Sequence, residues 1–319
     1  MIKVEHLSKH FGIVKAVDGI SFEVKEHETL ILLGTSGCGK TTTLKMLNRL
    51  IEPSSGSISI NGKNILEQKP EELRRGIGYV LQNIGLFPHY TIAENIVIVP
   101  QLLKWDSKRL EKRAEELMDK LHLSASQLNA YPNELSGGQQ QRVGLARALM
   151  ADPPILLMDE PFGALDNITR SKIQAEFKGL DELKKKTIIM VTHDVQEAFE
   201  LGDRICLMDK GKIVQIGTPS ALLYKPANDF VRDFLKDQRL QLEFRSVKIK
   251  DLWKWLPVSK ADSEGHKLSI DSNIWLGLQG LDASRSGHLH FTHQHETRMA
   301  GFEQLMSAFH QYQSSRAHE

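Results

Sequence analysis

The residues from Gly34 to Thr41 follow the pattern G-x-x-x-x-G-K-[ST], which forms a loop that binds phosphate groups. An apolar run typical of a strand, Thr29–Leu33, precedes the loop, and an amphipathic segment typical of a helix, Thr42–Leu50, follows it. Backbone N–H groups at a helix start have no partner within the helix, and glycines let an anion approach them. We therefore expect Lys40 to contact the β- and γ-phosphates of a nucleoside triphosphate and the Thr41 hydroxyl to bind Mg2+.

The remaining residues of this loop are expected to line the same nucleotide site. They are Gly34, Thr35, Ser36, Gly37, Cys38, Gly39 and Thr42. One alternative is a glycine turn ahead of a helix in which the lysine falls by chance. Another is a redox role for Cys38, because the start of a helix can lower the pKa of a thiol.

A second glycine-containing turn, Leu135-Ser-Gly-Gly-Gln139, also precedes a segment typical of a helix, Gln140–Met150. By the same argument it offers backbone N–H groups to a phosphate, and we expect Ser136, Gly138 and Gln139 to contact it. One triphosphate needs only one such cradle in full. The two cradles therefore indicate that nucleotides are shared between two copies of the chain.

Two adjacent carboxylates, Asp159 and Glu160, end an uninterrupted apolar run, Ile155–Met158, which is typical of a central parallel strand. Open α/β sheets place their ligands at the carboxyl ends of such strands. Phosphoryl transfer to water needs a metal ion and a group that orients or deprotonates the water. We expect Asp159 to bind the metal, directly or through a water, and Glu160 to act as the general base. A surface glutamate at a strand-to-loop junction is the alternative for Glu160.

Three further side chains are candidates for the nucleotide site because of their positions in the sequence. His193 follows the apolar run Thr187–Thr192 and is expected to contact the γ-phosphate or to orient the attacking water. Gln82 follows the run Ile77–Leu81 and offers an amide oxygen to Mg2+ and to that water. Phe11 is a candidate platform for stacking on adenine. A purely structural histidine and a phenylalanine that packs within the N-terminal strands are the competing interpretations.

The hydrophobic pattern predicts a layered α/β fold. Alternation in Ile2–Val4 and Gly19–Val24 predicts antiparallel strands joined by a turn at Asp18-Gly19. Farther along, strands alternate with helical segments, which predicts a mostly parallel, three-layer α/β domain. Between the two cradles, apolar residues form one stripe of a helix, at Leu110, Ala114, Leu117, Met118 and Leu121. We expect this stripe to pack in a core; a membrane-surface helix is the alternative, which a polar face of mixed charge disfavours.

Composition limits the classes of function. The chain has 41 basic and 40 acidic side chains and a formal net charge of +1, so it lacks the strongly basic character typical of bulk nucleic-acid binding. Only Cys38 and Cys206 are present and no secretory apolar region follows Met1, so a reducing cytoplasm is expected. The longest apolar runs fall far short of the roughly 20 residues that cross a bilayer. If the protein works at a membrane, another subunit must span it.

The order of these motifs resembles that of the nucleotide-binding subunits of ABC transporters. In sequence they are the Gly34–Thr41 loop, Gln82, Leu135–Gln139, Ile155–Glu160, Ala164-Leu-Asp166 and His193. The resemblance covers residues 1–239. It implies a P-loop NTPase fold with an antiparallel β subdomain and a helical subdomain at about residues 90–150. It also implies that Ser136 and Gly138 of one copy close over ATP held by the other in a head-to-tail homodimer, with Asp166 at the nucleotide site.

The resemblance implies an ATPase and a set of partners. ATP binding would close the pair and hydrolysis would reopen it. Two integral membrane permease subunits and an extracytoplasmic solute-binding protein are the implied partners, with no nucleic acid. The implied location is the cytoplasmic face of the inner (plasma) membrane, to which the protein is attached peripherally. Ile84–Tyr90, which is apolar and aromatic where a loop is usually polar, is implied to form part of the groove for a coupling helix of the permease.

Four segments resemble more closely the branch that imports osmoprotectants, quaternary amines such as glycine betaine, choline and carnitine. They are Leu44–Pro53, Leu73–Arg75, Ile84–Pro88 and Val99–Trp105. The cargo follows from this similarity alone. Two other classes stay open: a soluble ABC-type ATPase that acts on nucleic acid or ribosomes, and a binding module without turnover. The single cassette and the absence of a long insertion between Lys40 and Ser136 disfavour the first, and the presence of Glu160 disfavours the second.

Residues 240–319 resemble the family less. Relatives often carry a pair of CBS modules here, and Phe244-Arg-Ser-Val247 resembles the start of one, so we expect a reduced or divergent CBS-like α+β regulatory segment. Four histidines in this segment suggest a metal site, at His288, His290, His293 and His295. However, the alternation in Gly287–Phe291 predicts a half-buried strand with both of its histidines on the face opposite to the leucine and phenylalanine. We favour the strand over the metal site.

Overall fold

Apolar runs form the central strands of the chain in a computed structural model. β3 (Thr29–Gly34), β7 (Ile155–Asp159) and β8 (Thr187–Val191) are buried along almost their whole length, as expected for parallel strands covered on both faces. The structure describes residues 1–163, 165–258, 266–284, 286–293 and 296–317. By packing, these residues divide into two compact units, Met1–Ile216 and Gly217–Glu319.

The first unit is built on a six-stranded sheet in the order β10-β9-β3-β8-β7-β6. Its other strands are β6 (Ile77–Val80), β9 (Arg204–Asp209) and β10 (Lys212–Gly217). The pairs β6·β7, β7·β8, β8·β3 and β3·β9 are all parallel, so the carboxyl ends of these strands lie at one edge. This arrangement confirms the predicted α/β fold with a mostly parallel sheet.

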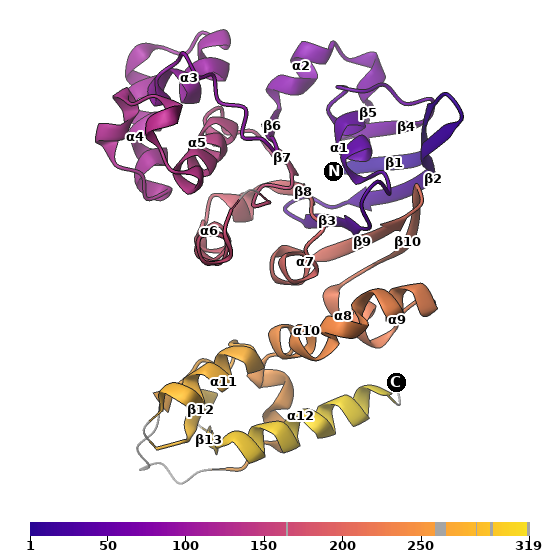
Figure 1. Cartoon of the computed structure of the whole chain (residues 1–319), viewed down its shortest axis with the longest axis vertical. Helices are drawn as coiled ribbons and strands as arrows, with labels where there is room; N and C mark the ends of the chain where they lie inside the picture. Colours follow the sequence, from indigo (N-terminus) through magenta and orange to yellow (C-terminus); the bar gives the residue numbers. More distant parts are fainter. Residues whose placement is uncertain (164, 259–265, 285, 294–295, 318–319) are drawn as a thin grey trace. The chain divides into compact units, whose positions relative to one another are not determined.

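Helices surround this sheet, and several of them gather in a lobe of their own (Figure 1). The lobe contains α3 (Ile92–Leu102), α4 (Ser107–Lys120) and α5 (Gly137–Leu149). The apolar stripe predicted along α4 faces the interior, because Ala114, Leu117 and Met118 are buried. The remaining helices of the unit are α1 (Lys40–Leu47), α2 (Pro70–Arg75), α6 (Asn167–Gly179) and α7 (Val195–Leu201), with 3-10 turns η1 (Ile65–Glu67), η2 (Ala125–Asn129), η3 (Pro132–Glu134) and η4 (Leu183–Lys185).

A four-stranded antiparallel sheet in the order β2-β1-β4-β5 forms the N-terminal part. Its strands are β1 (Ile2–Phe11), β2 (Val14–Val24), β4 (Ser55–Ile60) and β5 (Lys63–Asn64). The predicted turn at Asp18-Gly19 is wrong, because β1 and β2 join after Phe11 instead. Gly19 has a φ of +67° inside β2, where the register with β1 shifts, so the Asp-Gly pair marks a β-bulge.

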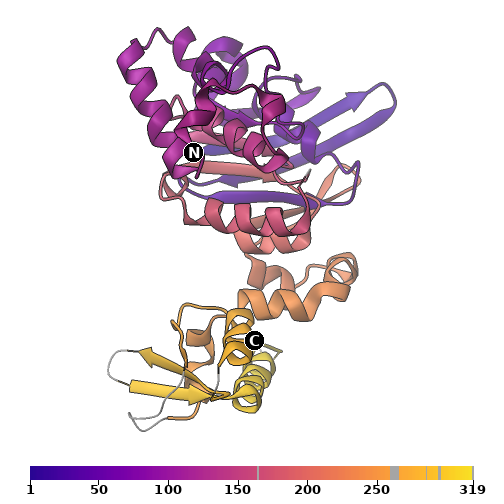
Figure 2. The ribbon, with the colours of Figure 1, turned by 60° about the vertical axis from the view of Figure 1, so that its left-hand side comes forward.

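The second unit has its own apolar core, which includes Leu289, Phe291, Leu305 and Phe309. Its strands β12 (Leu289–His293) and β13 (Glu296–Ala300) pair antiparallel beside helices of the same unit (Figure 2). The other elements are β11 (His266–Lys267), α8 (Pro219–Tyr224), α9 (Asp229–Leu235), α10 (Arg239–Ser246), α11 (Ile274–Ala283), α12 (Phe302–Ala317), η5 (Lys236–Gln238) and η6 (Ile249–Trp255). Packing therefore separates the units at 216/217, and the domain boundary at 239/240 stays a prediction.

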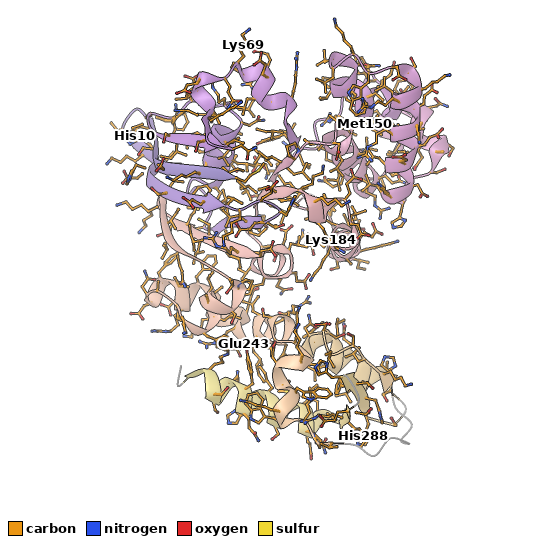
Figure 3. The ribbon with its side chains drawn as sticks, turned by 180° about the vertical axis from the view of Figure 1, so that it is seen from behind. His10, Lys69, Met150, Lys184, Glu243 and His288 are labelled. Atoms are coloured by element: carbon orange, nitrogen blue, oxygen red, sulfur yellow. The ribbon has the colours of Figure 1, made fainter. Side chains whose placement is uncertain are left out.

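The histidine-rich strand of the second unit differs in part from its prediction. β12 forms, and Leu289 and Phe291 are fully buried, but His290 is only 7% exposed and does not face solvent. The strand is the central one of the order β11-β12-β13, in which His290 pairs with Lys267 of β11 and Met299 of β13. Figure 3 shows His288 well apart from Glu243 of α10. Within the described ranges no group of three or more His, Cys, Asp or Glu could hold a metal ion, and His295 lies outside those ranges.

Gly78 tests the close packing of β6 against α5. A Cβ atom at this position would lie 2.5 Å from the Ala148 carbonyl oxygen and 2.5 Å from Leu156 Cδ2. We expect Gly78→Ala to lower the free energy of unfolding by about 1–3 kcal/mol through overpacking. Gly179→Ala is the matched control, because a Cβ there would meet nothing within 4 Å. Urea unfolding of the full chain measures both, and equal stabilities would contradict the packing of β6.

Candidate nucleotide site

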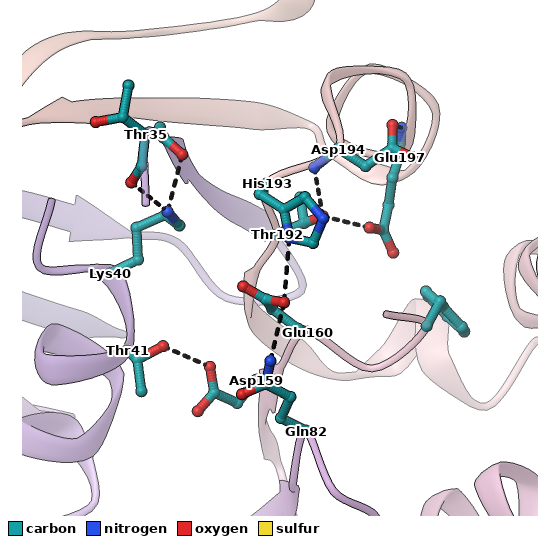
Figure 4. Close-up of polar contacts among 12 residues, drawn as sticks. Thr35, Lys40, Thr41, Gln82, Asp159, Glu160, Thr192, His193, Asp194 and Glu197 are labelled. Carbon is teal, nitrogen blue, oxygen red and sulfur yellow. Dashed lines mark hydrogen bonds and ion pairs between the residues drawn. The ribbon is translucent and has the colours of Figure 1, made fainter. Parts of the chain in front are cut away.

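The Gly34–Thr41 loop connects the carboxyl end of β3 to the start of α1, as predicted. Lys40 is 6% exposed, and its Nζ donates hydrogen bonds to the backbone oxygens of Gly34, at 2.8 Å, and Thr35, at 2.9 Å (Figure 4). The ammonium is thus held inside the curve of the loop. A buried cation is favoured when an anion can approach it, and the exposed face of the loop, at Ser36 and Gly37, leaves room for that approach.

Gly39 shows why this loop tolerates so few side chains. Its φ is +103°, and a Cβ atom would lie 2.3 Å from the Ala16 carbonyl oxygen of β2. The antiparallel sheet therefore lies directly against the loop. Phe11 pairs with Val14 near the β1–β2 turn, is half exposed, and carries Lys9 Nζ 5.1 Å from its ring centroid. An exposed ring on the strand pair that borders the loop can stack on a base.

The side chains expected to bind metal meet at the ends of β3 and β7. Thr41 Oγ1 donates a hydrogen bond of 2.8 Å to Asp159 Oδ1. Asp159 is 4% exposed, and burial raises the pKa of its carboxyl group, with the Glu160 charge acting in the same direction. A carboxylate in such a position gains from a nearby cation. The hydroxyl and carboxylate oxygens are the hard donors that Mg2+ prefers, so this pair fits a magnesium ion.

Glu160 is brought together with the two other predicted catalytic side chains. Its Oε2 lies 3.1 Å from His193 Nδ1 and 3.1 Å from Gln82 Nε2 (Figure 4). The backbone of Glu160 adopts a φ of +45°, a conformation uncommon outside glycine, and its N–H donates to the Val191 oxygen at 3.0 Å. Strained backbone of this kind is concentrated at functional sites. His193 is exposed, so a ligand could reach it.

The second cradle also forms at a helix start, but apart from the first. Ser136 caps α5: its Oγ accepts from the Gln139 N–H at 3.3 Å, and Gln139 Oε1 accepts from the Ser136 N–H at 2.9 Å. Ser136 is exposed, whereas Gly138 is buried. Across the residues that the structure describes, no hydrogen bond joins the Leu135–Gln139 turn to the Gly34–Thr41 loop.

Asp166 caps the next helix. Its Oδ1 accepts from the N–H groups of Ile168 and Thr169, each at 3.1 Å, and hydrogen bonding to Thr169 holds the pKa of this exposed carboxyl below its ordinary value. Ala164 of the same motif lies outside the described residues. Within the described residues Asp166 makes no hydrogen bond to Lys40 or Thr41, so one chain alone does not bring Asp166 into the cluster.

Cys38 does not match the redox alternative. The residue is 2% exposed, and burial raises the pKa of its thiol, an effect that outweighs the lowering by Lys40. A reactive thiol needs the opposite shift and an accessible sulfur. Cys38 therefore contributes its backbone and its small size to the loop, with its Sγ 3.8 Å from Lys40 Nζ.

Sequence reasoning missed the residues that support His193. Thr192 Oγ1 donates to the buried carboxylate of Glu197, and it accepts from the Asp194 N–H at 3.0 Å. Asp194 caps α7 by accepting from the Glu197 N–H at 3.1 Å, and its other oxygen pairs with Arg170 at 3.6 Å. The spacing of Asp194 and Glu197, an N-cap residue followed three positions later by a glutamate, was the available signal.

The apolar segment Ile84–Tyr90 is held rigidly at the surface. Buried Asn95 accepts from the Phe87 N–H at 2.8 Å and donates to the oxygens of Phe87 and Tyr90. Arg147 donates to the oxygens of Ile84 and Gly85, both at 2.7 Å. The rings of Phe87 and Tyr90 are 50% and 46% exposed, with centroids 5.5 Å apart. Fixed backbone below exposed rings is typical of a surface that receives a partner.

The parallel sheet, the lysine loop and the paired carboxylates together define a P-loop ATP-binding protein. Residues 17–163 match the family described as ABC transporter. The chain belongs to the ATP-binding proteins of ABC transporters, as the relatives below also show. No helix in the described part of the chain has the length and apolar character needed to cross a membrane.

Several similar curated proteins are ATP-binding proteins for transport of glycine betaine, choline, carnitine or osmoprotectants. The chain is 56% identical over 241 residues to the glycine betaine/carnitine/choline transport ATP-binding protein OpuCA of Bacillus subtilis, which covers 75% of this chain and 63% of the relative. It is 56% identical over 245 residues to the osmoprotectant import ATP-binding protein OsmV of Salmonella typhimurium, over 75% of this chain and 64% of the relative. It is 50% identical over 248 residues to the glycine betaine uptake system ATP-binding protein YehX of Escherichia coli, over 78% and 80%. The matched region thus spans somewhat less than two thirds of the first two relatives.

A solved structure supports the fold of the first unit. The dimeric post-hydrolysis state of the ATP-binding cassette MJ0796, bound to ADP and Pi, superposes with a TM-score of 0.61 at 34% identity. The match covers 68% of this chain and 98% of that cassette. That solved structure is dimeric and holds ADP and Pi.

Glu197 predicts a pH effect on stability. Burial raises the pKa of its carboxyl from 4.5 to about 7. The folded chain therefore binds this proton more tightly than the unfolded chain. The contribution of Glu197 to the free energy of unfolding is fully present below pH 4.5 and is lost as the pH rises through about 7. We expect Glu197→Gln, which keeps a partner for Thr192, to remove a decline of about 3 kcal/mol in the free energy of unfolding. Chemical unfolding of both proteins between pH 4.5 and 7.5, a range of ~3 pH units, measures this decline. If the free energy of unfolding depends on pH in the same way for both proteins, the raised pKa of Glu197 is contradicted.

Proposed function

We propose that this chain is the ATP-hydrolysing subunit of an ABC importer that takes up osmoprotectants, quaternary amines such as glycine betaine, choline or carnitine. The observation that carries the catalytic part is the convergence of Lys40, the Thr41–Asp159 pair and the Glu160–His193–Gln82 cluster at one edge of the parallel sheet. The names of the relatives support the cargo class.

Each residue of the cluster has a role in this proposal. Lys40 leaves the Gly34 and Thr35 oxygens and binds the β- and γ-phosphates, while the loop N–H groups from Gly34 to Thr42 surround them. Thr41, Asp159 and Gln82 hold Mg2+, which neutralises charge on the phosphate oxygens when bound. Glu160 accepts a proton from the attacking water, and His193 contacts the γ-phosphate and keeps Glu160 oriented through their 3.1 Å contact.

A second copy completes the site. Ser136, Gly138 and Gln139 of one copy cover the γ-phosphate bound by the Lys40 loop of the other, and Asp166 lies at the interface of the pair. The exposure of Ser136 and Asp166, and the absence of any bond within the described chain between the two cradles, support this arrangement. The dimeric nucleotide-bound relative supports it as well. Phe11 stacks on adenine from the edge of the antiparallel sheet.

The membrane partners follow from the family. Two integral membrane permease subunits and an extracytoplasmic solute-binding protein complete the importer, and this chain works peripherally at the cytoplasmic face of the inner (plasma) membrane. The rigid aromatic surface at Ile84–Tyr90 is the proposed contact for the permease. Residues 240–319 are proposed to form a CBS-like regulatory segment. A soluble ATPase acting on nucleic acid is less well supported, because the net charge is only +1.

Glu160→Gln tests the catalytic assignment. The variant keeps the size of the side chain but loses the ability to accept a proton, so we expect ATP binding to persist while hydrolysis falls by about two or more orders of magnitude. ATP should also trap the variant as a homodimer, which size-exclusion chromatography with light scattering would detect. Near-normal turnover would remove Glu160 from the role of general base.

Uptake measurements test the cargo. In a bacterial strain that lacks its own osmoprotectant importers, we expect the complete importer containing this chain to accumulate at least one of radiolabelled glycine betaine, choline and carnitine under high salt. The same importer with Glu160→Gln is the control for ATP-driven uptake. Uptake of none of the three, while ATPase activity remains normal, would contradict the quaternary-amine cargo without affecting the ATPase assignment.

A further inference from the structure

Arg170 connects two loops that leave different strands of the sheet. Its Nε donates to the Phe162 oxygen at 3.3 Å, and one terminal nitrogen donates to the Leu165 oxygen at 2.9 Å. Its other terminal nitrogen lies 3.6 Å from Asp194 Oδ2. The first two contacts belong to the loop after Glu160, and the third belongs to the loop that carries His193. One guanidinium therefore contacts both.

The contact with Asp194 acts on a constrained piece of backbone. The Asp194 N–H donates to Thr192 Oγ1, and Asp194 Oδ1 accepts from the Glu197 N–H that starts α7. Thr192 in turn donates to the Glu197 carboxylate, which is 5% exposed. The residues on both sides of His193 are thus fixed to one another and to α7. Moving Asp194 would move His193 with it.

The contacts with Phe162 and Leu165 act on the other loop. Phe162 is buried at 3% exposure and Leu165 at 7%, and the Leu165 N–H donates to the Phe162 oxygen at 3.3 Å, so Arg170 adds its contacts to a turn that is already closed by one hydrogen bond. A planar guanidinium can satisfy two carbonyls and a carboxylate at once, which an ammonium cannot do with the same geometry. This loop begins at Glu160 and leads to Asp166, which caps the helix that carries Arg170.

We propose that Arg170 is a positioning residue that holds the Glu160 loop and the His193 loop in register, so that the 3.1 Å contact between Glu160 and His193 forms. The proposal rests on the proposed function of those two residues. Because Arg170 also fixes the segment that leads to Asp166, it links the surface assigned to the second copy with the catalytic pair. Arg170 itself does not touch ATP or water in this proposal.

A purely structural role would give a different pattern of effects. Loss of a partly exposed ion pair that serves only stability lowers the free energy of unfolding and leaves the turnover of the folded protein unchanged. Loss of a positioning contact lowers kcat and leaves the affinity for ATP unchanged, because the Lys40 loop is intact. The two roles are therefore separated by kcat and KM measured on folded protein.

The experiment uses the full chain with Arg170→Ala, Asp194→Asn and both changes together. Asparagine keeps an oxygen that can cap α7, so Asp194→Asn removes mainly the charge that Arg170 contacts. We expect each single change to lower kcat about tenfold with KM for ATP unchanged, and the double variant to be no slower than the slower single variant. Arg170→Lys should be intermediate, because it keeps the charge but not the three contacts.

Arg204→Ala is the matched control. Arg204 also donates to a backbone oxygen, of Glu23 at 3.1 Å, and pairs with a buried carboxylate, Glu28, at 3.1 Å. Its side chain is 31% exposed against 26% for Arg170, and it starts β9, at the end of the sheet opposite to the nucleotide loop. We expect this variant to keep the wild-type kcat while its stability falls by a similar amount.

Three results would overturn the proposal: a wild-type kcat in Arg170→Ala, single-variant effects that multiply in the double variant, or an equal loss of kcat in Arg204→Ala. Glu160→Gln, measured alongside, separates this failure from failure of the proposed function. If Glu160→Gln blocks hydrolysis while Arg170→Ala does not slow it, only the positioning role is wrong. If Glu160→Gln turns over normally, the catalytic assignment on which the proposal rests is wrong.

Discussion

Parallel pairing of β3 with β8, β8 with β7, and β7 with β6 is the constraint on which the site depends. Four loops that are far apart in the sequence leave these strands at one edge, and each carries at least one polar group of the cluster. Antiparallel pairing of any neighbouring two would send one loop to the opposite edge and separate Lys40 from Glu160 or His193. The apolar strand residues thus determine where the charged residues meet, although they have no chemistry of their own.

The cluster contains more buried charge than is usual in the core of a folded protein. Lys40 and Asp159 are both nearly inaccessible, and burial raises the pKa of Asp159. The backbone oxygens of Gly34 and Thr35 satisfy the lysine, and Thr41 satisfies the aspartate. These are neutral partners for charged groups, so a polyphosphate and a divalent cation would replace them with stronger, charge-assisted contacts. The desolvation cost of these two buried charges therefore favours binding of a polyphosphate and a divalent cation.

The sequence predicted the elements of the sheet and the residues that meet at its edge, because apolar runs and the lysine loop are local patterns with few alternative meanings. Predictions from the sequence failed where the conformation of a residue depends on contacts with residues far away in the chain. Asp18-Gly19 is a common turn sequence. In this chain the pair forms a bulge in β2 instead, where the Asp18 N–H donates to the Gly211 oxygen. His290 is buried although it alternates with the buried Leu289 and Phe291, and alternation alone does not reveal that its face of the strand is covered as well. Arg170 was missed for the same reason: its partners come from loops on two different strands.

The position of Arg170 also bears on the proposed division of the site between two copies. Within one chain, the lysine loop, the metal-side pair and Glu160 are assembled, whereas Ser136 and Asp166 remain exposed away from them. A site divided in this way can respond to the presence of the second copy only if something fixed joins the exposed surface to the catalytic pair. The helix that Asp166 caps carries Arg170 one turn later, and Arg170 contacts the loop of His193. In the proposal, Asp166 is therefore connected to the Glu160–His193 contact through the first turn of α6 and the Arg170 guanidinium.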